Sequence, residues 1–203
     1  MIGIIDYDMG NVGSIKKMLQ KIGVEAVITR DPELLKSADK LILPGVGAFA
    51  KGMQNLAQLN LINILNELVL EKKTPVLGIC LGMQLLTTHS EEGNVNGFNW
   101  IKAHTIRFPE KGIRIPHMGW NNIKVSNDNI LFNGLETDNR FYFVHSYYVQ
   151  PENILHEASS TEYILPFSSA IYKNNIYGVQ FHPEKSHRFG LKLLKNFVSL
   201  NTL

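Results

Sequence analysis

The sequence predicts an α/β fold in which a mainly parallel sheet is flanked by helices and continued by an antiparallel β extension. The first half alternates short, continuous aliphatic runs with amphipathic helical patterns, which is typical of parallel strands covered on both faces. From about residue 97 to 177, aromatic and β-branched residues between turns are typical of antiparallel strands. The 203 residues, 44% of them hydrophobic, suffice for one core, so we expect a single domain over residues 1–203.

The strands are predicted from runs of aliphatic and aromatic residues. In the first half they are expected at residues 2–5, 24–28, 40–43 and 76–79. In the second half they are expected at residues 140–149, 169–172 and 176–181. Residues 173–175, Lys-Asn-Asn, form a plausible hairpin turn between the last two strands.

The helices are predicted from apolar periodicity and from start signals. After a turn at residues 10–13, Ser14 is expected to cap a helix whose apolar face recurs at i, i+3, i+4 and i+7, namely Ile15, Met18, Leu19 and Ile22. The Asp-Pro pair at residues 31–32 predicts the start of a second helix. A long amphipathic helix is expected within residues 53–70 and a shorter one over 83–88. A closing helix has the apolar face Leu191, Leu194, Phe197 and Val198.

The composition narrows the class of protein. Twenty basic and 18 acidic residues leave a net charge of +2, without the charge excess typical of nucleic-acid or membrane binders. Apolar stretches stay well below the ~18 residues that span a bilayer, and the N-terminus lacks the basic region of a secretory signal. The one cysteine excludes an internal disulfide and suits a reducing compartment. We therefore expect a cytoplasmic protein that binds neither nucleic acid nor membrane.

Cys80 is the candidate nucleophile. It lies in Gly78-Ile79-Cys80-Leu81-Gly82, directly after a predicted strand and before a predicted helix, which is the G-x-nucleophile-x-G pattern of a nucleophile elbow. The free N–H groups at the start of the helix favour a thiolate, and the N–H of Leu81 can stabilise an oxyanion. A lone cysteine out of context is more often a small buried hydrophobe, but this context favours a nucleophile.

His182 and Glu184 are the candidate base and the group that orients it. Of the seven histidines, only His182 has an acid placed to orient it at very short range, in Gln180-Phe181-His182-Pro183-Glu184. A thiol nucleophile needs such a base, and the base needs an orienting partner. Alone, the tripeptide would equally suit a surface turn. Together with the elbow, it predicts a catalytic set of Cys80, His182 and Glu184.

These two motifs resemble those of the class I glutamine amidotransferases. Four further segments resemble one branch of that family, the glutaminase subunits of imidazole glycerol phosphate synthases: Pro44-Gly45-Val46-Gly47-Ala48-Phe49, Met118-Gly119-Trp120-Asn121, Phe143-Val144-His145-Ser146-Tyr147 and Pro183-Glu184-Lys185-Ser186. The resemblance covers essentially the whole chain and shows no departure at the elbow or the triad. It implies a flavodoxin-like fold and the hydrolysis of glutamine through a γ-glutamyl thioester on Cys80, without a cofactor.

The resemblance also implies how glutamine is held. The substrate would contact Gly47, Gln84, Ser146 and Tyr147. The second oxyanion donor would be the N–H of Val46, which stands where most class I relatives have glycine. Because a β-branched residue resists positive φ, we expect the peptide before Val46 to rest with its carbonyl toward the site until a partner binds.

A partner subunit follows from the same resemblance. Ammonia would pass to a cyclase subunit of (β/α)₈-barrel fold in a heterodimer, which makes imidazole glycerol phosphate and an aminoimidazole carboxamide ribonucleotide in histidine biosynthesis. An isolated tryptophan is more often a core residue, but Trp and Met are enriched at interfaces. The residues implied to face the partner or to line the ammonia exit are Asn11, Met118, Trp120, Asn121, Tyr142 and Lys185.

Two other kinds of site have partial support in the sequence. Residues 45–50 imitate the G-x-G-x-x-A of a dinucleotide site, but they follow the third strand, and the candidate acid, Glu67, lies inside a helical pattern. His182, Glu184 and His187 are clustered enough to suggest a metal site. A structural zinc site needs four protein ligands, however, and no second cluster at ligand spacing is present, so we expect no metal.

Two other functions stay open at this point. A non-catalytic subunit could keep the fold, although the nucleophile and the base are both intact. Paralogues of the same branch supply ammonia to barrel partners that amidinate or aminate surface sugars. Their glutaminase chemistry would be identical, so this sequence discriminates poorly between the two pathways, and neighbouring genes would discriminate better.

Overall fold

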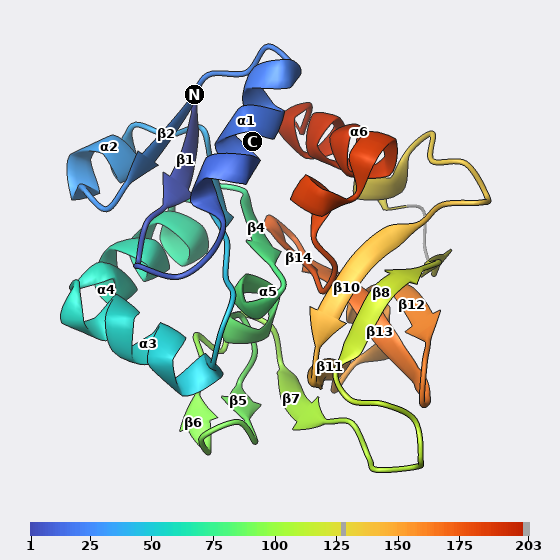
Figure 1. Cartoon of the computed structure of the whole chain (residues 1–203). Coiled ribbons are helices and arrows are strands. Elements are labelled where there is room, and N and C mark those ends of the chain that lie inside the picture. The colour runs from blue at the N-terminus through green and yellow to red at the C-terminus, as the bar shows by residue number, and fades with distance from the viewer. Residues whose placement is uncertain (127–128, 201–203) are drawn as a thin grey trace.

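A mainly parallel sheet runs through the middle of the molecule (Figure 1). The structure is a computed structural model that describes residues 1–126 and 129–200. The parallel strands lie in the order β2-β1-β3-β4-β14, with the bounds Ala26–Thr29, Ile2–Ile5, Lys40–Leu43, Val76–Ile79 and Ile176–Val179. With β14 as the fifth strand, this is the order 2-1-3-4-5 of flavodoxin-like folds, which confirms the predicted fold class.

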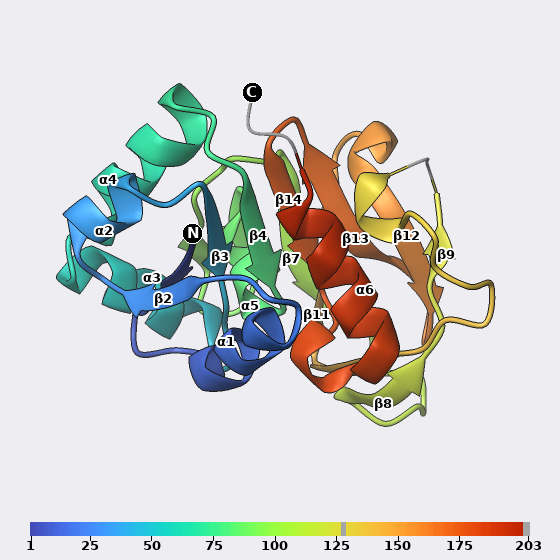
Figure 2. The same ribbon diagram turned by 90° about the horizontal axis from the view of Figure 1, so that it is seen from above.

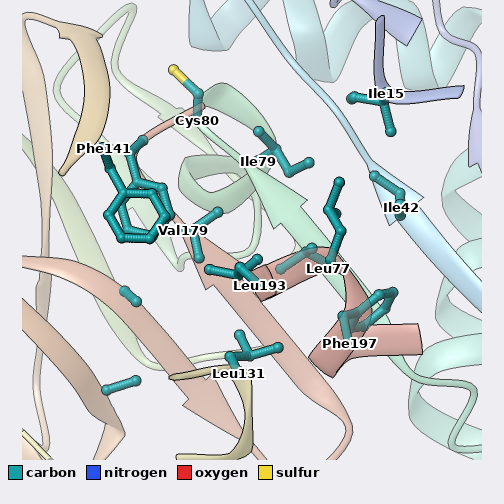
Figure 3. Close-up of a cluster of buried hydrophobic side chains, with 14 of the residues drawn as sticks. Ile15, Ile42, Leu77, Ile79, Cys80, Leu131, Phe141, Val179, Leu193 and Phe197 are labelled. Carbon is teal, nitrogen blue, oxygen red and sulfur yellow. The ribbon is translucent and has the colours of Figure 1, made fainter. Parts of the chain in front are cut away.

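Helices cover both faces of this sheet (Figures 1 and 2). On one face lie α1 (Val12–Lys21) and α6 (His187–Val198), whose buried side chains pack with Ile42, Leu77 and Ile79 of the strands (Figure 3). On the other face lie α2 (Pro32–Lys36), α3 (Phe49–Gln58), α4 (Leu61–Asn66), a π-helical turn (Glu67–Glu71) and α5 (Leu81–Leu85). Because successive strand residues point to opposite faces, each strand contributes to both cores.

The antiparallel extension begins at β14, which pairs with β4 on one side and with β13 on the other. The sheet continues through β13 (Pro166–Lys173), β11 (Tyr147–Pro151), β7 (Ala103–Arg107), β5 (His89–Ser90) and β6 (Val95–Asn96), where β5 joins β7 in parallel. Beside this path, β12 (Glu157–Glu162) pairs with β13, and β9 (Lys124–Val125) pairs with β12. A second sheet pairs β8 (His117–Asn121) with β10 (Phe141–His145). Short 3₁₀ turns occupy Ile130–Phe132, Ile154–His156 and Pro183–Lys185.

Several predicted elements coincide with the structure. The strands at residues 2–5, 40–43 and 76–79 have the predicted bounds because each is a continuous aliphatic run buried on both faces. The predicted hairpin turn joins β13 to β14, with Asn174 at a φ of 55°. Asp31 caps α2 as expected, because its side chain accepts hydrogen bonds from the N–H groups of Glu33 and Leu34.

The first residues of α1 and β2 differ from those predicted. Ser14 is not the cap of α1, because the helix begins at Val12 and the residue before it, Asn11, is in the capping position. The second strand begins at Ala26 instead of residue 24. The N–H of Val24 donates to the carbonyl of Leu19, so this residue closes the end of α1 and does not enter the sheet.

The predicted long helix is two helices, and the next one begins early. The first starts at Phe49, and Asn60, in the left-handed region with a φ of 57°, separates it from α4. Asparagine tolerates this region better than most residues, and nothing in the apolar periodicity indicates the break. The helix predicted over residues 83–88 is α5, which begins at Leu81 directly after the turn at Cys80.

The strand predicted over residues 140–149 is two strands in two different sheets. Its first part, β10, pairs with β8, whereas its second part, β11, pairs with β7. Ser146 lies between them, and its carbonyl accepts the N–H of Phe108. The predicted strand at residues 169–172 extends over Pro166–Lys173, and the last one ends at Val179 because the chain then turns toward Pro183.

Close packing of α5 against the sheet requires glycine at two positions. A Cβ on Gly82 would lie 1.8 Å from the carbonyl oxygen of Leu43, at the end of β3. A Cβ on Gly78 would lie 2.7 Å from the backbone of Gly82. The first turn of α5 can therefore lie directly on the strand ends. Over the described residues, the structure contains no helix long and apolar enough to cross a lipid bilayer.

Replacing Gly82 by alanine should destabilise the fold, because the new Cβ would force the backbone of Leu43 to move. We expect the free energy of unfolding to fall by about 3 kcal/mol or more. Gly13→Ala is the matched control, since its Cβ would meet nothing within 4 Å and alanine should add about 0.5 kcal/mol in a helix. Urea denaturation measures both changes, and a Gly82→Ala variant as stable as wild type would contradict the packing argument.

Candidate active site

Cys80 forms the turn between β4 and α5. Its φ of 54° and ψ of −109° are unusual for a residue with a side chain. The backbone N–H donates to the carbonyl of Val179 at 2.8 Å, so the neighbouring strand β14 holds the turn. The residue is 6% exposed, and Figure 3 shows its sulfur directed away from the aliphatic cluster. The backbone therefore has the form of the predicted elbow, at the carboxyl edge of the sheet.

His182 and Glu184 form a buried pair next to this turn. The Nδ1 atom of His182 lies 2.7 Å from Oε1 of Glu184, and their side chains are 1% and 2% exposed. The short 3₁₀ turn from Pro183 folds the carboxylate back onto the ring. Because a carboxylate only accepts, Nδ1–H is the donor and Nε2 is the atom free to exchange a proton.

The backbone around the base is fixed by Ser186 and Tyr142. The N–H of His182 donates to the carbonyl of Tyr142 at 2.9 Å. The hydroxyl of Ser186 donates to the carbonyl of His182 at 2.6 Å and accepts the N–H of Tyr142 at 3.0 Å. The backbone of His182 is thus fixed by hydrogen bonds both within its own turn and to strand β10.

His182 is arranged to take a proton from Cys80. Burial lowers the pKa of His182, but the neighbouring Cys80 sulfur and the Glu184 carboxylate raise it more, to about 10. Its Nε2 atom is buried and makes no hydrogen bond of ordinary geometry with the described residues. His182 can therefore hold a proton that it receives from Cys80, as the base of a thiol nucleophile must.

A cavity of about 320 Å³ opens beside the Cys80 sulfur. This volume suits a small ligand of about the size of an amino acid. All the residues that the sequence predicted for the oxyanion hole and for glutamine binding line this cavity, and so does the candidate nucleophile. They are Val46, Gly47, Cys80, Leu81, Gln84, Ser146 and Tyr147.

Glu92 also lines this cavity, and the sequence did not indicate it. Its Oε2 atom accepts the N–H of Phe49 at 2.8 Å, at the start of α3. A carboxylate there is stabilised by the helix dipole and gives the cavity a negative group suited to an ammonium. Glu92 lies in the loop between β5 and β6, where no motif or periodicity distinguishes it from its neighbour Glu91.

The side chain of Gln84 connects α5 to the strands on the other side of the cavity. Its Nε2 atom donates to the carbonyl of Tyr147 and to Oε1 of Gln180, both at 3.1 Å. Since both bonds use the nitrogen, the amide oxygen is the end that a ligand N–H can reach.

The residues predicted to face a partner cluster around β8 and β10. Met118 and Trp120 are 56% and 47% exposed, which is high for large apolar side chains. Trp120 stacks on His187, with ring centroids 5.3 Å apart, and the ammonium of Lys185 lies 5.3 Å from the ring centroid of Tyr142. This cluster lies next to the turn that contains His182. Two further predicted residues are Asn121, at the end of β8, and Asn11, exposed at the start of α1.

A buried chain of side chains runs from β8 to the cavity. His145 Nδ1–H donates to the carbonyl of Tyr147 at 2.8 Å, so its Nε2 accepts from His117 Nδ1–H at 3.1 Å. His117 Nε2 then accepts from the amide of Asn121 at 3.3 Å. Burial lowers the pKa of His117 to about 4 and that of His145 to about 3, so both are neutral at pH 7.

The alternative sites fit the structure less well. Glu67 pairs with Lys72 on the π-helical turn and does not lie at a strand end, where a dinucleotide ribose would need it. The Glu184 carboxylate is engaged by His182, and His187 stacks on Trp120. Over residues 1–126 and 129–200, no group of three or more His, Cys, Asp or Glu side chains could hold a metal ion.

Sequence comparisons match nearly the whole chain. A family model described as glutamine amidotransferase class-I matches residues 3–200. The imidazole glycerol phosphate synthase subunit HisH 2 of Methanococcus maripaludis is 59% identical, with 98% of each chain covered. The imidazole glycerol phosphate synthase subunit HisH 2 of Pseudomonas aeruginosa is 45% identical over 98% of this chain and 100% of its own.

Solved structures with little sequence similarity share the fold. A glutamine amidotransferase, 18% identical, superposes with a TM-score of 0.77, with 97% of this chain and 96% of the other covered. The structure of PurLQS from Thermotoga maritima, 17% identical, gives a TM-score of 0.75 with the same coverage.

The buried histidines should make the protein sensitive to acid. In the unfolded chain, His117 and His145 take up protons near pH 6.5, whereas in the fold their pKa values lie at about 4 and 3. The free energy of unfolding is therefore highest above pH 6.5 and decreases as the pH drops toward 4. At pH 5 it should be lower than at pH 7 by about 2 kcal/mol for each of the two histidines. Urea unfolding at pH 7 and pH 5 measures this loss.

The variant His117→Gln keeps a polar side chain but cannot titrate. The decrease in its free energy of unfolding between pH 7 and pH 5 should therefore be about 2 kcal/mol smaller than the decrease in wild type. An identical pH dependence in wild type and His117→Gln would show that this histidine is not buried in its neutral form.

Proposed function

The chain belongs to the class I glutamine amidotransferases, and we propose that it is the glutaminase subunit of an imidazole glycerol phosphate synthase. It hydrolyses glutamine to glutamate and ammonia and passes the ammonia to a second subunit in histidine biosynthesis. The observation that carries the proposal is the buried His182–Glu184 pair next to Cys80, which lines a cavity of amino-acid size. The full-length similarity to subunits of that synthase, at 45% and 59% identity, supports the pathway. Residues 1–203 would make up one amidotransferase domain.

The reaction would follow from the protonation states of the pair. His182 takes the Cys80 proton, and the thiolate attacks the side-chain carbonyl carbon of glutamine. The tetrahedral intermediate collapses with transfer of the proton from His182 to the amide nitrogen, which leaves as ammonia. Water, deprotonated by His182, then attacks the thioester carbon, and the sulfur departs to release glutamate. Glu184 keeps the imidazole oriented and stabilises its charged form throughout.

The amino-acid end of glutamine would bind on the far side of the cavity from His182. The amide oxygen of Gln84 and the carboxylate of Glu92 are acceptors suited to an ammonium group. The backbone at Ser146 and Tyr147 would hold the substrate carboxylate. Gly47, with a φ of 111° and no side chain, leaves room for the scissile amide beside it.

The oxyanion hole would be incomplete in the resting subunit. Leu81 N–H, at the start of α5, supplies one donor, and Val46 N–H would supply the other. The carbonyl of Pro44 accepts a hydrogen bond from the hydroxyl of Tyr7 at 2.5 Å. Val46 is 43% exposed, and its backbone φ lies outside the left-handed region. Turning the peptide before Val46 toward the oxyanion requires positive φ at a β-branched residue, which costs energy that partner binding would offset.

The partner would bind the face formed by β8 and β10. Exposed Met118 and Trp120 supply the apolar contact that interfaces favour, and Lys185 lies directly after the catalytic glutamate. In this proposal the partner is a cyclase of (β/α)₈-barrel fold, and ammonia leaves past Tyr142 and Lys185. Asn11 and Asn121 would contact the partner at the edges of this face. The resulting heterodimer would work in the cytoplasm.

The function is tested by separating glutamine hydrolysis from ammonia use. Cys80→Ala, mixed with the cyclase subunit, should release no glutamate from glutamine and should support no glutamine-dependent synthesis. Because only the ammonia supply is lost, ammonium salts should restore synthesis to the level of the wild-type mixture. Glutamate release and product formation are measured in the same samples. In the presence of the cyclase subunit, glutamine hydrolysis by the Cys80→Ala variant above a few per cent of wild type would exclude Cys80 as the nucleophile.

The resting state of the oxyanion loop is tested by Val46→Gly. Glycine accepts positive φ freely, so the variant should hydrolyse glutamine without the partner about tenfold faster than wild type, the factor that corresponds to roughly 1–2 kcal/mol of backbone strain. Basal glutamate release at saturating glutamine measures the effect. Val125→Gly, at an exposed valine on β9, is the control and should leave basal release unchanged. A Val46→Gly variant as idle as wild type, yet still activated by the partner, would refute this explanation.

A further inference from the structure

The side chain of Gln180 contacts the Cys80 sulfur. Its Nε2 atom lies 3.7 Å from Sγ, within hydrogen-bond distance for sulfur. Gln180 follows β14 directly, is fully buried, and its backbone N–H donates to the carbonyl of Ser169 at 2.9 Å. The residue is therefore anchored at its backbone as well as at its side chain.

The orientation of the Gln180 amide follows from its neighbours. The carbonyl of Tyr147 can only accept, so the atom of Gln84 that contacts it must be the nitrogen. The same nitrogen contacts the Gln180 amide at 3.1 Å, and that contact therefore falls on the Gln180 oxygen. The Gln180 nitrogen is left facing Sγ. A flipped amide would bring two N–H groups together and leave the sulfur facing an oxygen.

A donor at this position has a specific electrostatic effect on the sulfur. The carbonyl oxygen of Val144 lies 4.0 Å from Sγ, where it can accept from a thiol but repels a thiolate. The Gln180 N–H opposes that repulsion, because an amide donor interacts more strongly with an anion than with a neutral thiol. Because Gln180 is fully buried, water cannot replace this donor on its side of the sulfur.

We propose that Gln180 is a catalytic residue of this glutaminase, whose amide N–H donates to the Cys80 sulfur and stabilises the thiolate. His182 receives the thiol proton, and Gln180 keeps its own protons and changes only the energy of the anion. The same hydrogen bond stabilises the thiolate again when it leaves the thioester. Gln84 then has two tasks, since it binds the substrate and also holds the Gln180 amide in the donating orientation. The inference rests on the proposed function, because it names a further residue of the same site.

The test uses the fact that the chain has one cysteine. Alkylation of the full chain by iodoacetamide reports thiolate at Cys80 alone, so its rate is measured against pH for wild type and for Gln180→Met, which has the same length but no N–H. We expect the midpoint of the profile to move up by about one pH unit, since a hydrogen bond to a charged group is lost. With the partner present, kcat for glutamine should fall at least about tenfold, while ammonium-dependent synthesis stays unchanged.

Gln150→Met, at an exposed glutamine on β11, is the control and should leave the alkylation midpoint in place. Should Gln180→Met fail to fold, Gln180→Asn takes its place, because it keeps a neutral amide but is one methylene shorter. The N–H is thereby withdrawn from Sγ without any added charge, and the midpoint must again rise. An unchanged midpoint in the folded variant overturns the role of Gln180. Wild type without glutaminase activity would instead refute the proposed function, and the alkylation comparison would still stand.

Discussion

The backbone at Cys80 turns the chain from β4 into α5 within a single residue, in a conformation that costs energy for any side chain larger than hydrogen. Much of the surrounding structure maintains this turn. Gly78 and Gly82 let α5 lie on the strand ends, and the N–H of Cys80 is tied to β14. Because β14 pairs with β4 along its whole length, the residues that follow it arrive beside the sulfur. His182 and Gln180 both reach the nucleophile in this way, from about a hundred residues away in the sequence.

Three buried histidines near the cavity show how neighbours decide a protonation state. Burial alone lowers the pKa of an imidazole, and this effect prevails at His117 and His145, whose hydrogen-bond partners are neutral. At His182 the same effect is outweighed by the Glu184 carboxylate and the cysteine sulfur. The fold thus keeps one basic imidazole beside Cys80 and two neutral ones on β8 and β10.

Sequence reasoning succeeded where the determining interactions are local. The strands ending at Leu43 and Ile79 are continuous apolar runs, and the His182–Glu184 pair is two residues apart, so a short turn suffices to form it. The misses have tertiary causes. Glu92 faces the cavity only because its loop reaches the start of α3. The predicted strand is interrupted at Ser146 because the residues before it pair in one sheet and the residues after it pair in the other. Likewise, the break at Asn60 follows from the packing of two helices, which the apolar pattern does not encode.

The chain of hydrogen bonds from Asn121 through His117 and His145 to the Tyr147 carbonyl resembles a proton wire but cannot conduct. One end is an amide and the other a carbonyl, and neither exchanges protons near neutral pH. Each imidazole is therefore locked in one tautomer, and a proton can neither enter nor leave along this route. In the proposed mechanism the acid–base chemistry at Cys80 would therefore involve His182 alone, because no proton can pass from it along this chain to the surface that carries Trp120. A change on that surface would leave the charge of His182 unaltered.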